Sequence, residues 1–141
     1  MELCFLCGIF SGPGRQIYII YAIFLVASEQ LQIHWVGDAK QVLSEFPHEI
    51  KSLFGYSLRR IQRGLLPDCD ARRMESIGKG VWELKAADER AWYRVLYLTR
   101  IGNALYVIHA FEKDSRKTGK RDLEVAKNRF KLIQSLLKNT E

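Results

Sequence analysis

The stretch that decides the fold is VWELKAADERAWYRVLYLTRIGNALYVIHAFEK, residues 81–113. Apolar, aromatic and β-branched side chains dominate three runs within it, and each run has the length of a strand. The dipeptides Asp88-Glu89 and Gly102-Asn103 separate the runs and suit tight hairpin turns. The segment therefore predicts an antiparallel meander of strands over residues 81–86, 91–100 and 105–113.

The residues before this meander predict a strand and two helices. Residues 31–36 alternate apolar and polar side chains, as a half-buried strand does, and Asp38 then offers an N-cap to a short helix over residues 39–46. Pro47 stands where a second helix has its first residue, and apolar side chains recur at helical spacing until Gly64. Residues 65–80 contain a proline, two aspartates and two glycines, which predicts a loop with Arg72, Arg73 and Lys79 exposed.

The residues after the meander predict a last helix, over residues 118–137. Its apolar side chains form one stripe, made of Leu123, Ala126, Phe130, Ile133 and Leu137. The predicted order is strand, helix, helix, three strands, helix. We therefore expect an α+β fold in which helices pack on a twisted antiparallel sheet.

Composition places the chain among ordinary globular domains. It has 141 residues, of which 48% are hydrophobic and 27% charged, and this length can bury a stable core without disulfides or a structural metal. Cys4, Cys7 and Cys69 are too few and too unevenly spaced for a disulfide framework or a zinc finger. The reducing cytosol is the expected compartment, and we expect no cofactor and no metal.

Charge divides the chain into two parts. Glu2, Arg15 and Glu29 are the only charged side chains in residues 1–30, so residues 31–141 carry a net charge of +7. Such an excess favours a polyanionic partner, whether nucleic acid, an anionic membrane surface or an acidic protein. We expect an N-terminal extension over residues 1–30 and a folded domain over residues 31–141.

The extension contains an uncharged apolar run at residues 17–27. It is shorter than the roughly 20 residues that a membrane-spanning helix needs, so we expect no stable membrane insertion. The run has the length of a secretory signal core, but the first ten residues lack the basic stretch of such a signal. The other interpretations are an extra packed strand or helix, and an upstream stretch translated from a wrongly assigned start.

Two-residue turns in the meander bring several polar side chains together. Glu83 then lies opposite Arg94, Lys85 opposite Trp92, Arg94 opposite Phe111, Leu96 opposite His109, and Trp92 opposite Lys113. One face of the sheet gathers Glu83, Lys85, Arg94, His109 and Lys113, with Trp92 and Phe111 among them. The other face, with Trp82, Leu84, Tyr93, Val95, Tyr97, Tyr106 and Ile108, is the predicted core.

The gathered face has structural and functional interpretations. Arg94 on a central strand either lines a solvated concavity or forms an ion pair with Glu83, and both can hold. His109 is either a hydrogen-bonded structural histidine or an acid/base, and Lys113 is either a solvated charge or a phosphate ligand. Cations with aromatic neighbours form a surface that can hold phosphates and stack an unpaired base. The sequence has no phosphate-loop, HExxH or GxSxG motif and no paired aspartates at metal-ligand spacing, which disfavours a metal-dependent nuclease. Metal-free transesterification is the phosphodiester chemistry that remains.

Several phrases of the sequence resemble a known family. They are Phe46-Pro47, the run 55–64, Trp82-Glu83-Leu84-Lys85, Tyr93–Tyr97, His109–Lys113, Lys117-Thr118 and Ala126-Lys127-x-Arg129. In this order and spacing they resemble the phage-related HigB-type toxins of the RelE/ParE superfamily, over about residues 31–137. The resemblance implies a RelE-like fold and the toxin of a type II toxin–antitoxin pair. It also implies a HigA-like helix-turn-helix antitoxin as partner, and mRNA on the translating ribosome as substrate.

The resemblance also implies roles for particular residues. The 2'-hydroxyl of the substrate would attack the adjacent phosphate, with Arg94 stabilising the transition state, Lys113 binding phosphate or moving a proton, and His109 acting as acid/base. The implied RNA and phosphate ligands are Lys85, Arg116, Lys117, Lys120 and Arg121, and Glu83 is the structural partner of Arg94. Lys85 replaces a commoner arginine, Asp114 replaces a lysine, and Gly119 replaces a proline, and these departures could weaken activity.

Two other functions stay open at this point. A ParE-like protein shares the expected fold but inhibits DNA gyrase and cleaves no RNA. A degenerate phage remnant would bind antitoxin or RNA without turnover, and Asp114 and the unusual N-terminal segment favour it. Ribosome-dependent cleavage of mRNA would separate the toxin from both.

Overall fold

The computed structural model describes residues 30–114 and 119–140. Residues 1–29, which make up nearly all of the predicted N-terminal extension, lie outside the described residues. Arg116 and Lys117 also lie outside them. The described elements are β1 (Gln32–Trp35), α3 (Ala39–Glu45), α4 (His48–Gln62), β2 (Asp70–Arg73), β3 (Val81–Ala87), β4 (Trp92–Ile101), β5 (Ala104–Lys113) and α5 (Lys120–Lys138). None of these helices is long and apolar enough to cross a bilayer.

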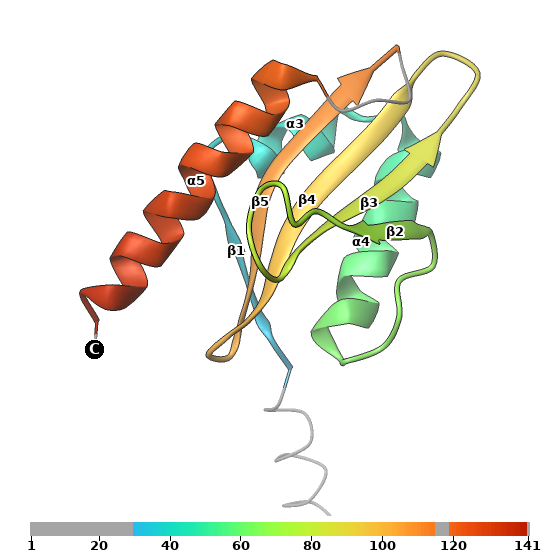
Figure 1. Cartoon of the computed structure of the whole chain (residues 1–141). Coiled ribbons are helices and arrows are strands. Elements are labelled where there is room, and N and C mark those ends of the chain that lie inside the picture. Colours follow the sequence, from blue (N-terminus) through green and yellow to red (C-terminus); the bar gives the residue numbers. More distant parts are fainter. Residues whose placement is uncertain (1–29, 115–118, 141) are drawn as a thin grey trace, which may run out of the picture. The chain divides into compact units, whose positions relative to one another are not determined.

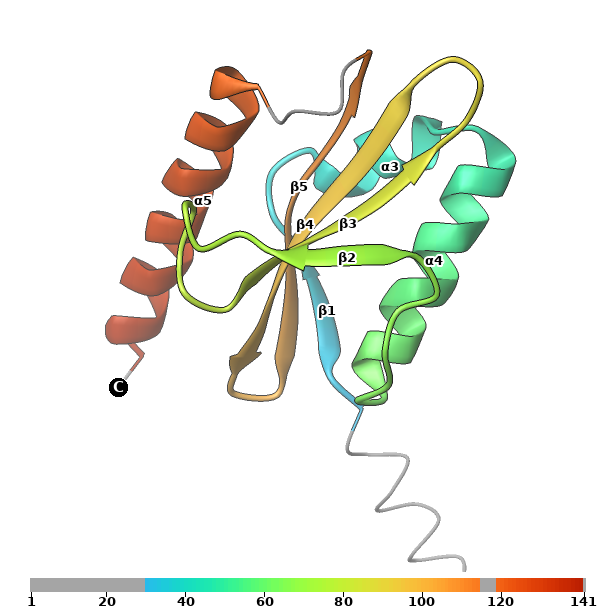
Figure 2. The ribbon, with the colours of Figure 1, turned by 45° about the vertical axis from the view of Figure 1, so that its right-hand side comes forward.

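Five strands form one sheet in the order β1-β5-β4-β3-β2. β1 runs parallel to β5, and the other neighbours are antiparallel, so the sheet is mixed and not purely antiparallel as predicted. α5 covers one face of the sheet, and α3 and α4 cover the other (Figures 1 and 2). The predicted α+β class is confirmed, and the arrangement is compatible with a RelE-like fold.

The helices form where the apolar spacing predicts them. α4 ends before Gly64, whose positive φ of 75° suits glycine, and it buries Ile50, Phe54, Leu58 and Ile61 against the sheet. α5 buries Ala126, Phe130 and Ile133 against the opposite face. Full burial of a large apolar side chain contributes about 1.5–3 kcal/mol, so these stripes hold the helices on the sheet.

The segment predicted as a loop over residues 65–80 contains the edge strand β2, so that prediction is wrong in part. Asp70 and Ala71 are poor strand formers, and the segment from Asp70 to Arg73 forms a strand through its pairing with β3. Asp70 lies opposite Lys85, and Arg72 lies opposite Glu83. Arg72 is therefore a neighbour of the predicted site and not a free loop residue.

The hairpin between β3 and β4 turns one residue later than predicted. Asp88 accepts hydrogen bonds through Oδ1 from the backbone N–H groups of Arg90 and Ala91, both at 2.9 Å, and its own N–H donates to the Ala91 carbonyl. The turn is thus centred on Glu89-Arg90 and not on Asp88-Glu89. Lys85 therefore lies opposite Arg94, and Glu83 opposite Leu96, which corrects the predicted pairs Lys85–Trp92 and Glu83–Arg94. The shift is two residues, so every side chain keeps its predicted face.

The hairpin between β4 and β5 has the predicted register at Trp92–Lys113, Arg94–Phe111 and Leu96–His109. A bulge follows, because Tyr97 pairs with Val107 and leaves Ile108 as an extra residue in β5. The bulge reverses the alternation of β5, so Tyr106 and Ile108 pack on the α5 face and not in the predicted core. That core, on the α3 and α4 face, does contain Leu84, Tyr93, Val95 and Tyr97, with Trp82 partly buried against it.

Candidate functional site

His109 lies on β5 beneath α5, and it is only 8% exposed. Its Nε2 is 3.1 Å from Oδ1 of Asp122, and its Nδ1 is 3.2 Å from a terminal nitrogen (NH1) of Arg129. The imidazole also stacks on the ring of Phe111, with 5.1 Å between the centroids. Both ring nitrogens therefore have protein partners from α5.

These partners define the protonation state of His109. A guanidinium group can only donate hydrogen bonds, so Nδ1 must accept from Arg129, and the single ring proton lies on Nε2 and is donated to Asp122. Burial lowers the pKa of His109 from its ordinary value of 6.5, and the Arg129 charge acts in the same direction against the opposing effect of Asp122. We therefore describe His109 as neutral at pH 7.

Arg129 connects this histidine to the turn between β1 and α3. It donates through NH1 to the Ile108 carbonyl at 3.0 Å and through NH2 to Oδ1 of Asp38 at 2.7 Å. Asp38 stands before α3 but makes no side-chain cap, because its carboxylate binds Arg129. This hydrogen-bonded guanidinium lowers the pKa of Asp38.

Gly37 makes room for this contact. Its φ is +58°, and a Cβ on it would come within 2.6 Å of the Arg129 guanidinium carbon. A side chain at position 37 would be strained and would also displace Arg129.

Lys113, at the end of β5, is connected to His109 through Asp122. Its Nζ is 3.8 Å from Oδ2 of Asp122, and its side chain remains 25% exposed. Gly119, just before α5, lies so close that a Cβ on it would overlap Nζ of Lys113. The glycine that departs from the resembled family therefore gives Lys113 its space. We call the five connected side chains Asp38, Arg129, His109, Asp122 and Lys113 the β5–α5 cluster.

Arg94 and Glu83 form a second cluster. Both side chains are fully buried, and NH1 of Arg94 is 3.0 Å from Oε1 of Glu83. Arg72 of β2 approaches the other carboxylate oxygen, Oε2, at 3.1 Å and remains 47% exposed. The predicted ion pair is thus present, diagonally across the strands, and Glu83 also accepts from an arginine that the sequence prediction placed on a loop. A side chain with no exposed surface cannot touch a substrate in this conformation.

The other predicted ligands are scattered. Lys85 is partly buried, and its Nζ is 3.6 Å from Oδ2 of Asp70. Lys120 and Arg121 are exposed in the first turn of α5, close along the chain to Asp122. Arg116 and Lys117 lie outside the described residues. The structure thus brings His109 and Lys113 together through Asp122 and puts Arg94 and Glu83 in a separate cluster.

Sequence reasoning missed Asp122, Arg129, Asp38 and Arg72 as members of these clusters. The sequence predicts a helix cap for Asp38, which is a local interpretation, and it includes Arg129 in a phrase of the resembled family. No periodicity marks Asp122, because it lies beside the apolar stripe and its partners are on another element. Among the described residues, no group of three or more His, Cys, Asp or Glu side chains is arranged to hold a metal ion.

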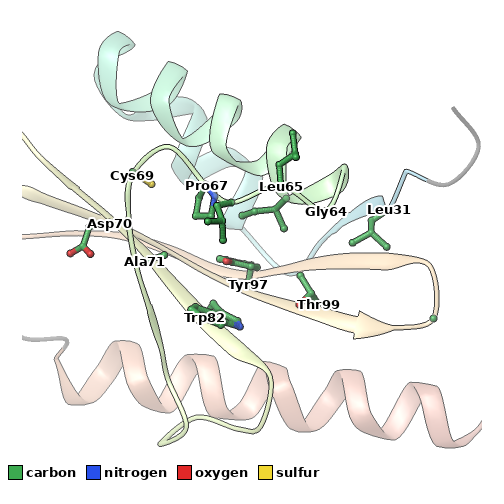
Figure 3. Close-up of a pocket in the computed structure, with 13 residues that line it drawn as sticks. Leu31, Gly64, Leu65, Pro67, Cys69, Asp70, Ala71, Trp82, Tyr97 and Thr99 are labelled. Atoms are coloured by element: carbon green, nitrogen blue, oxygen red, sulfur yellow. The ribbon is translucent and has the colours of Figure 1, made fainter. Parts of the chain in front are cut away.

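A pocket of about 740 Å³ lies on the opposite side of the sheet, next to the end of α4 (Figure 3). Apolar and aromatic groups dominate its lining, among them Leu65, Pro67, Trp82 and Tyr97. None of the predicted catalytic or phosphate-binding residues lines it. The predicted site residues that the structure describes are therefore outside the lining of this pocket.

A comparison with models of protein families identifies the family of the chain. A family model described as phage-derived protein Gp49-like (DUF891) matches residues 41–131, which is more than half of the chain. The chain belongs to the Gp49-like family. None of the curated proteins compared with the chain matches it.

The Gp49-like match runs from α3 through the first two thirds of α5 and includes β2, β3, β4 and β5. All of the predicted site residues lie within it, and so do Asp122 and Arg129. Asp38 lies just before it. The phage-derived Gp49-like assignment agrees with the phage-related, toxin-like character that the sequence resemblance predicts.

Proposed function

We propose that this Gp49-like protein is the toxin of a type II toxin–antitoxin pair and cleaves mRNA on the translating ribosome without a metal ion. The proposal includes the HigB-type assignment, a HigA-like helix-turn-helix antitoxin as partner, and the bacterial cytoplasm as location. The observation that carries it is the meeting of His109 and Lys113 at Asp122 in a chain of this family. The net charge of +7 over residues 31–141 favours a polyanionic substrate.

In the proposed reaction, the ribose 2'-hydroxyl gives up its proton as its oxygen attacks the adjacent phosphorus. The bond from phosphorus to the 5'-oxygen breaks, and the 5'-oxygen takes up a proton. The products are a 2',3'-cyclic phosphate and a free 5'-hydroxyl group. Negative charge develops on the phosphate oxygens, and a cation beside them lowers the barrier. Among the predicted catalytic residues, Lys113 has the exposed surface for this role, with Lys120 and Arg121 nearby along α5 as phosphate ligands.

His109 has a narrower role in this proposal than in the sequence prediction. Its two nitrogens are bound to Asp122 and Arg129, and only 8% of the residue is exposed. It acts as acid or base only if the substrate displaces one of these partners. In the resting arrangement it supports the carboxylate that faces Lys113.

The experiment is induction of the full chain in bacteria, followed by mapping of mRNA ends that carry a 5'-hydroxyl group. We expect growth arrest and cleavage within translated regions, and in purified components we expect cleavage only when ribosomes are present. Lys113→Ala should lower the cleavage rate roughly 100-fold, whereas Lys40→Ala, at an exposed lysine of α3, should leave it unchanged. Equal cleavage by both variants would remove Lys113 from the site. Efficient cleavage of free RNA without ribosomes would refute the ribosome requirement.

A second candidate function is favoured by the burial of Arg94 and His109. With two of the three predicted catalytic residues at most 8% exposed, the protein would bind antitoxin or RNA without turnover. Intact mRNA and normal growth after induction would support this candidate. Growth arrest with intact mRNA and altered DNA supercoiling would instead indicate a ParE-like inhibitor of gyrase.

A further inference from the structure

Asp122 contacts two candidate groups of the proposed site with its two carboxylate oxygens. Oδ1 accepts the Nε2 proton of His109 at 3.1 Å, and Oδ2 lies 3.8 Å from Nζ of Lys113. The carboxylate is about one-fifth exposed, so it lies at the boundary between the protein interior and solvent. It is the link between a buried imidazole and a partly exposed ammonium group.

The rest of the β5–α5 cluster keeps this carboxylate in place. Arg129 occupies Nδ1 of His109, so the imidazole presents its proton toward Asp122 and cannot rotate without losing a hydrogen bond. Arg129 is itself bound to Asp38 and to the Ile108 carbonyl. Charged groups of alternating sign therefore run from the turn before α3 to Lys113, with neutral His109 in the middle.

An ammonium group has three hydrogens, and the contact with Asp122 uses at most one of them. The others remain for a ligand on the solvent side, where the side chain is exposed. A lysine on a flexible stem loses rotational freedom when a carboxylate holds it, and that loss is otherwise incurred when the substrate binds. A held lysine is thus better prepared for a phosphate than a free one.

We propose, on the basis of the proposed function, that Asp122 is a positioning residue of the RNA-cleavage site and that it acts by holding the ammonium group of Lys113 against β5. His109 and Arg129 serve this purpose by orienting the Asp122 carboxylate. The competing explanation is that Asp122 only anchors α5 on the sheet. A second competing explanation is that its negative charge only repels the RNA phosphate.

The test compares Asp122→Asn with Glu124→Gln in the full chain. Both variants remove one negative charge from the first turns of α5, but Glu124 is exposed and makes no side-chain hydrogen bond or ion pair with any residue in the ranges 30–114 and 119–140. We expect Asp122→Asn to lower the ribosome-dependent cleavage rate at saturating substrate roughly 10- to 100-fold and to change the KM less than threefold. Glu124→Gln should change neither value more than twofold.

A double-mutant cycle with Lys113 identifies the route of the effect. If Asp122 acts through Lys113, Asp122→Asn should cause no further loss in the Lys113→Ala background. An equal further loss in that background would overturn the proposal in favour of an independent role. An unchanged or faster rate for Asp122→Asn alone would overturn it in favour of simple repulsion.

The melting temperature and the cleavage rate together separate a defect in folding from a loss of positioning. The melting temperatures of Asp122→Asn and Glu124→Gln should agree within a few degrees, because the apolar stripe of α5 holds the helix on the sheet. If the cleavage rate of Asp122→Asn is low only where the variant is unfolded, Asp122 is an anchor and the proposal is wrong. If the wild-type chain cleaves no mRNA, the proposed function fails, and the positioning role fails with it. Cleavage by the wild type that survives Asp122→Asn overturns the positioning role alone.

Discussion

Arg94 and Glu83 are opposite charges with no exposed surface, in the middle of a sheet that is covered on both faces. Removal of one partner from a buried pair leaves the other charge in a poorly solvated place, and the cost exceeds that of losing a contact at the surface. Arg72 reaches the same carboxylate from solvent, so it compensates only in part. At the residue scale, the stability of the fold therefore depends on the presence of both members of this pair.

We predict that Arg94→Ala lowers the free energy of unfolding by about 3 kcal/mol and that Glu83→Gln in the same background restores a large part of the loss. Arg72→Ala, which removes a half-exposed partner, should cost less than about 1 kcal/mol. Urea denaturation measures all three. Because Arg94 is buried, RNA cleavage by its alanine variant should follow the folded fraction. A folded Arg94→Ala variant of normal stability that has lost cleavage would instead establish a direct catalytic role.

At the scale of elements, one tight turn and one β-bulge decide which side chains are neighbours and which face of the sheet they occupy. The Asp88 side chain moves the β3–β4 turn by one residue, and this replaces the predicted neighbours of Arg94 and Glu83 without moving either to the other face. The bulge at Ile108 changes more, because it turns Tyr106 and Ile108 toward α5. Ile108 and His109 are thus both available to contacts with α5, and Arg129 binds both of them.

α5 depends on a narrow stripe for its attachment. Phe130 is buried between β5 and the segment after β2, whereas Leu132, two residues further along the helix, is 54% exposed. We predict that Phe130→Ala lowers the free energy of unfolding by about 3–5 kcal/mol and that Leu132→Ala changes it by less than about 1 kcal/mol. Chemical denaturation compares the two. Similar effects of both substitutions would show that α5 is not attached through this stripe.

At the scale of the whole molecule, His109 makes the stability of the fold depend on pH. Its pKa is lowered in the folded state, first by burial and then by the charge of Arg129, while Asp122 and Asp38 act in the opposite direction. Below the ordinary value of 6.5 the unfolded chain takes up a proton that the folded chain resists. The contribution of neutral His109 is therefore complete above pH 6.5 and declines as the pH falls toward the folded pKa.

We predict that the wild-type protein loses stability between pH 7 and pH 5.5 and that His109→Gln shows a smaller loss over the same interval. His48→Gln, at an exposed histidine of α4, should behave like the wild type. The lowered pKa of Asp38 affects stability only at more acid pH, since its ordinary value is 3.8. Thermal denaturation at several pH values measures the difference, and identical slopes for wild type and His109→Gln would contradict the neutral, hydrogen-bonded histidine.

The sequence by itself determined the features that depend on local periodicity. The α+β class, the positions of β1, α3, α4 and α5, and the three strands from Val81 to Lys113 follow from which side chains must be buried along each element. It also placed Glu83, Arg94, His109 and Lys113 on one face, because alternation along a strand survives a shift of two residues. The family match over residues 41–131 supports the phage-derived interpretation that the sequence resemblance indicated.

Only the tertiary structure decided which of those side chains meet. Arg129 and Asp38 are 91 residues apart, and Asp122 reaches His109 only because α5 folds back over β5. β2 exists because β3 is beside it, and the turn at Asp88 and the bulge at Ile108 depend on hydrogen bonds that strand propensity does not specify. The hydrophobic pattern of a sequence indicates that a residue faces the interior, but it does not identify the side chain that the residue contacts there. The polar contacts of the candidate site, which depend on partners, therefore required the folded chain.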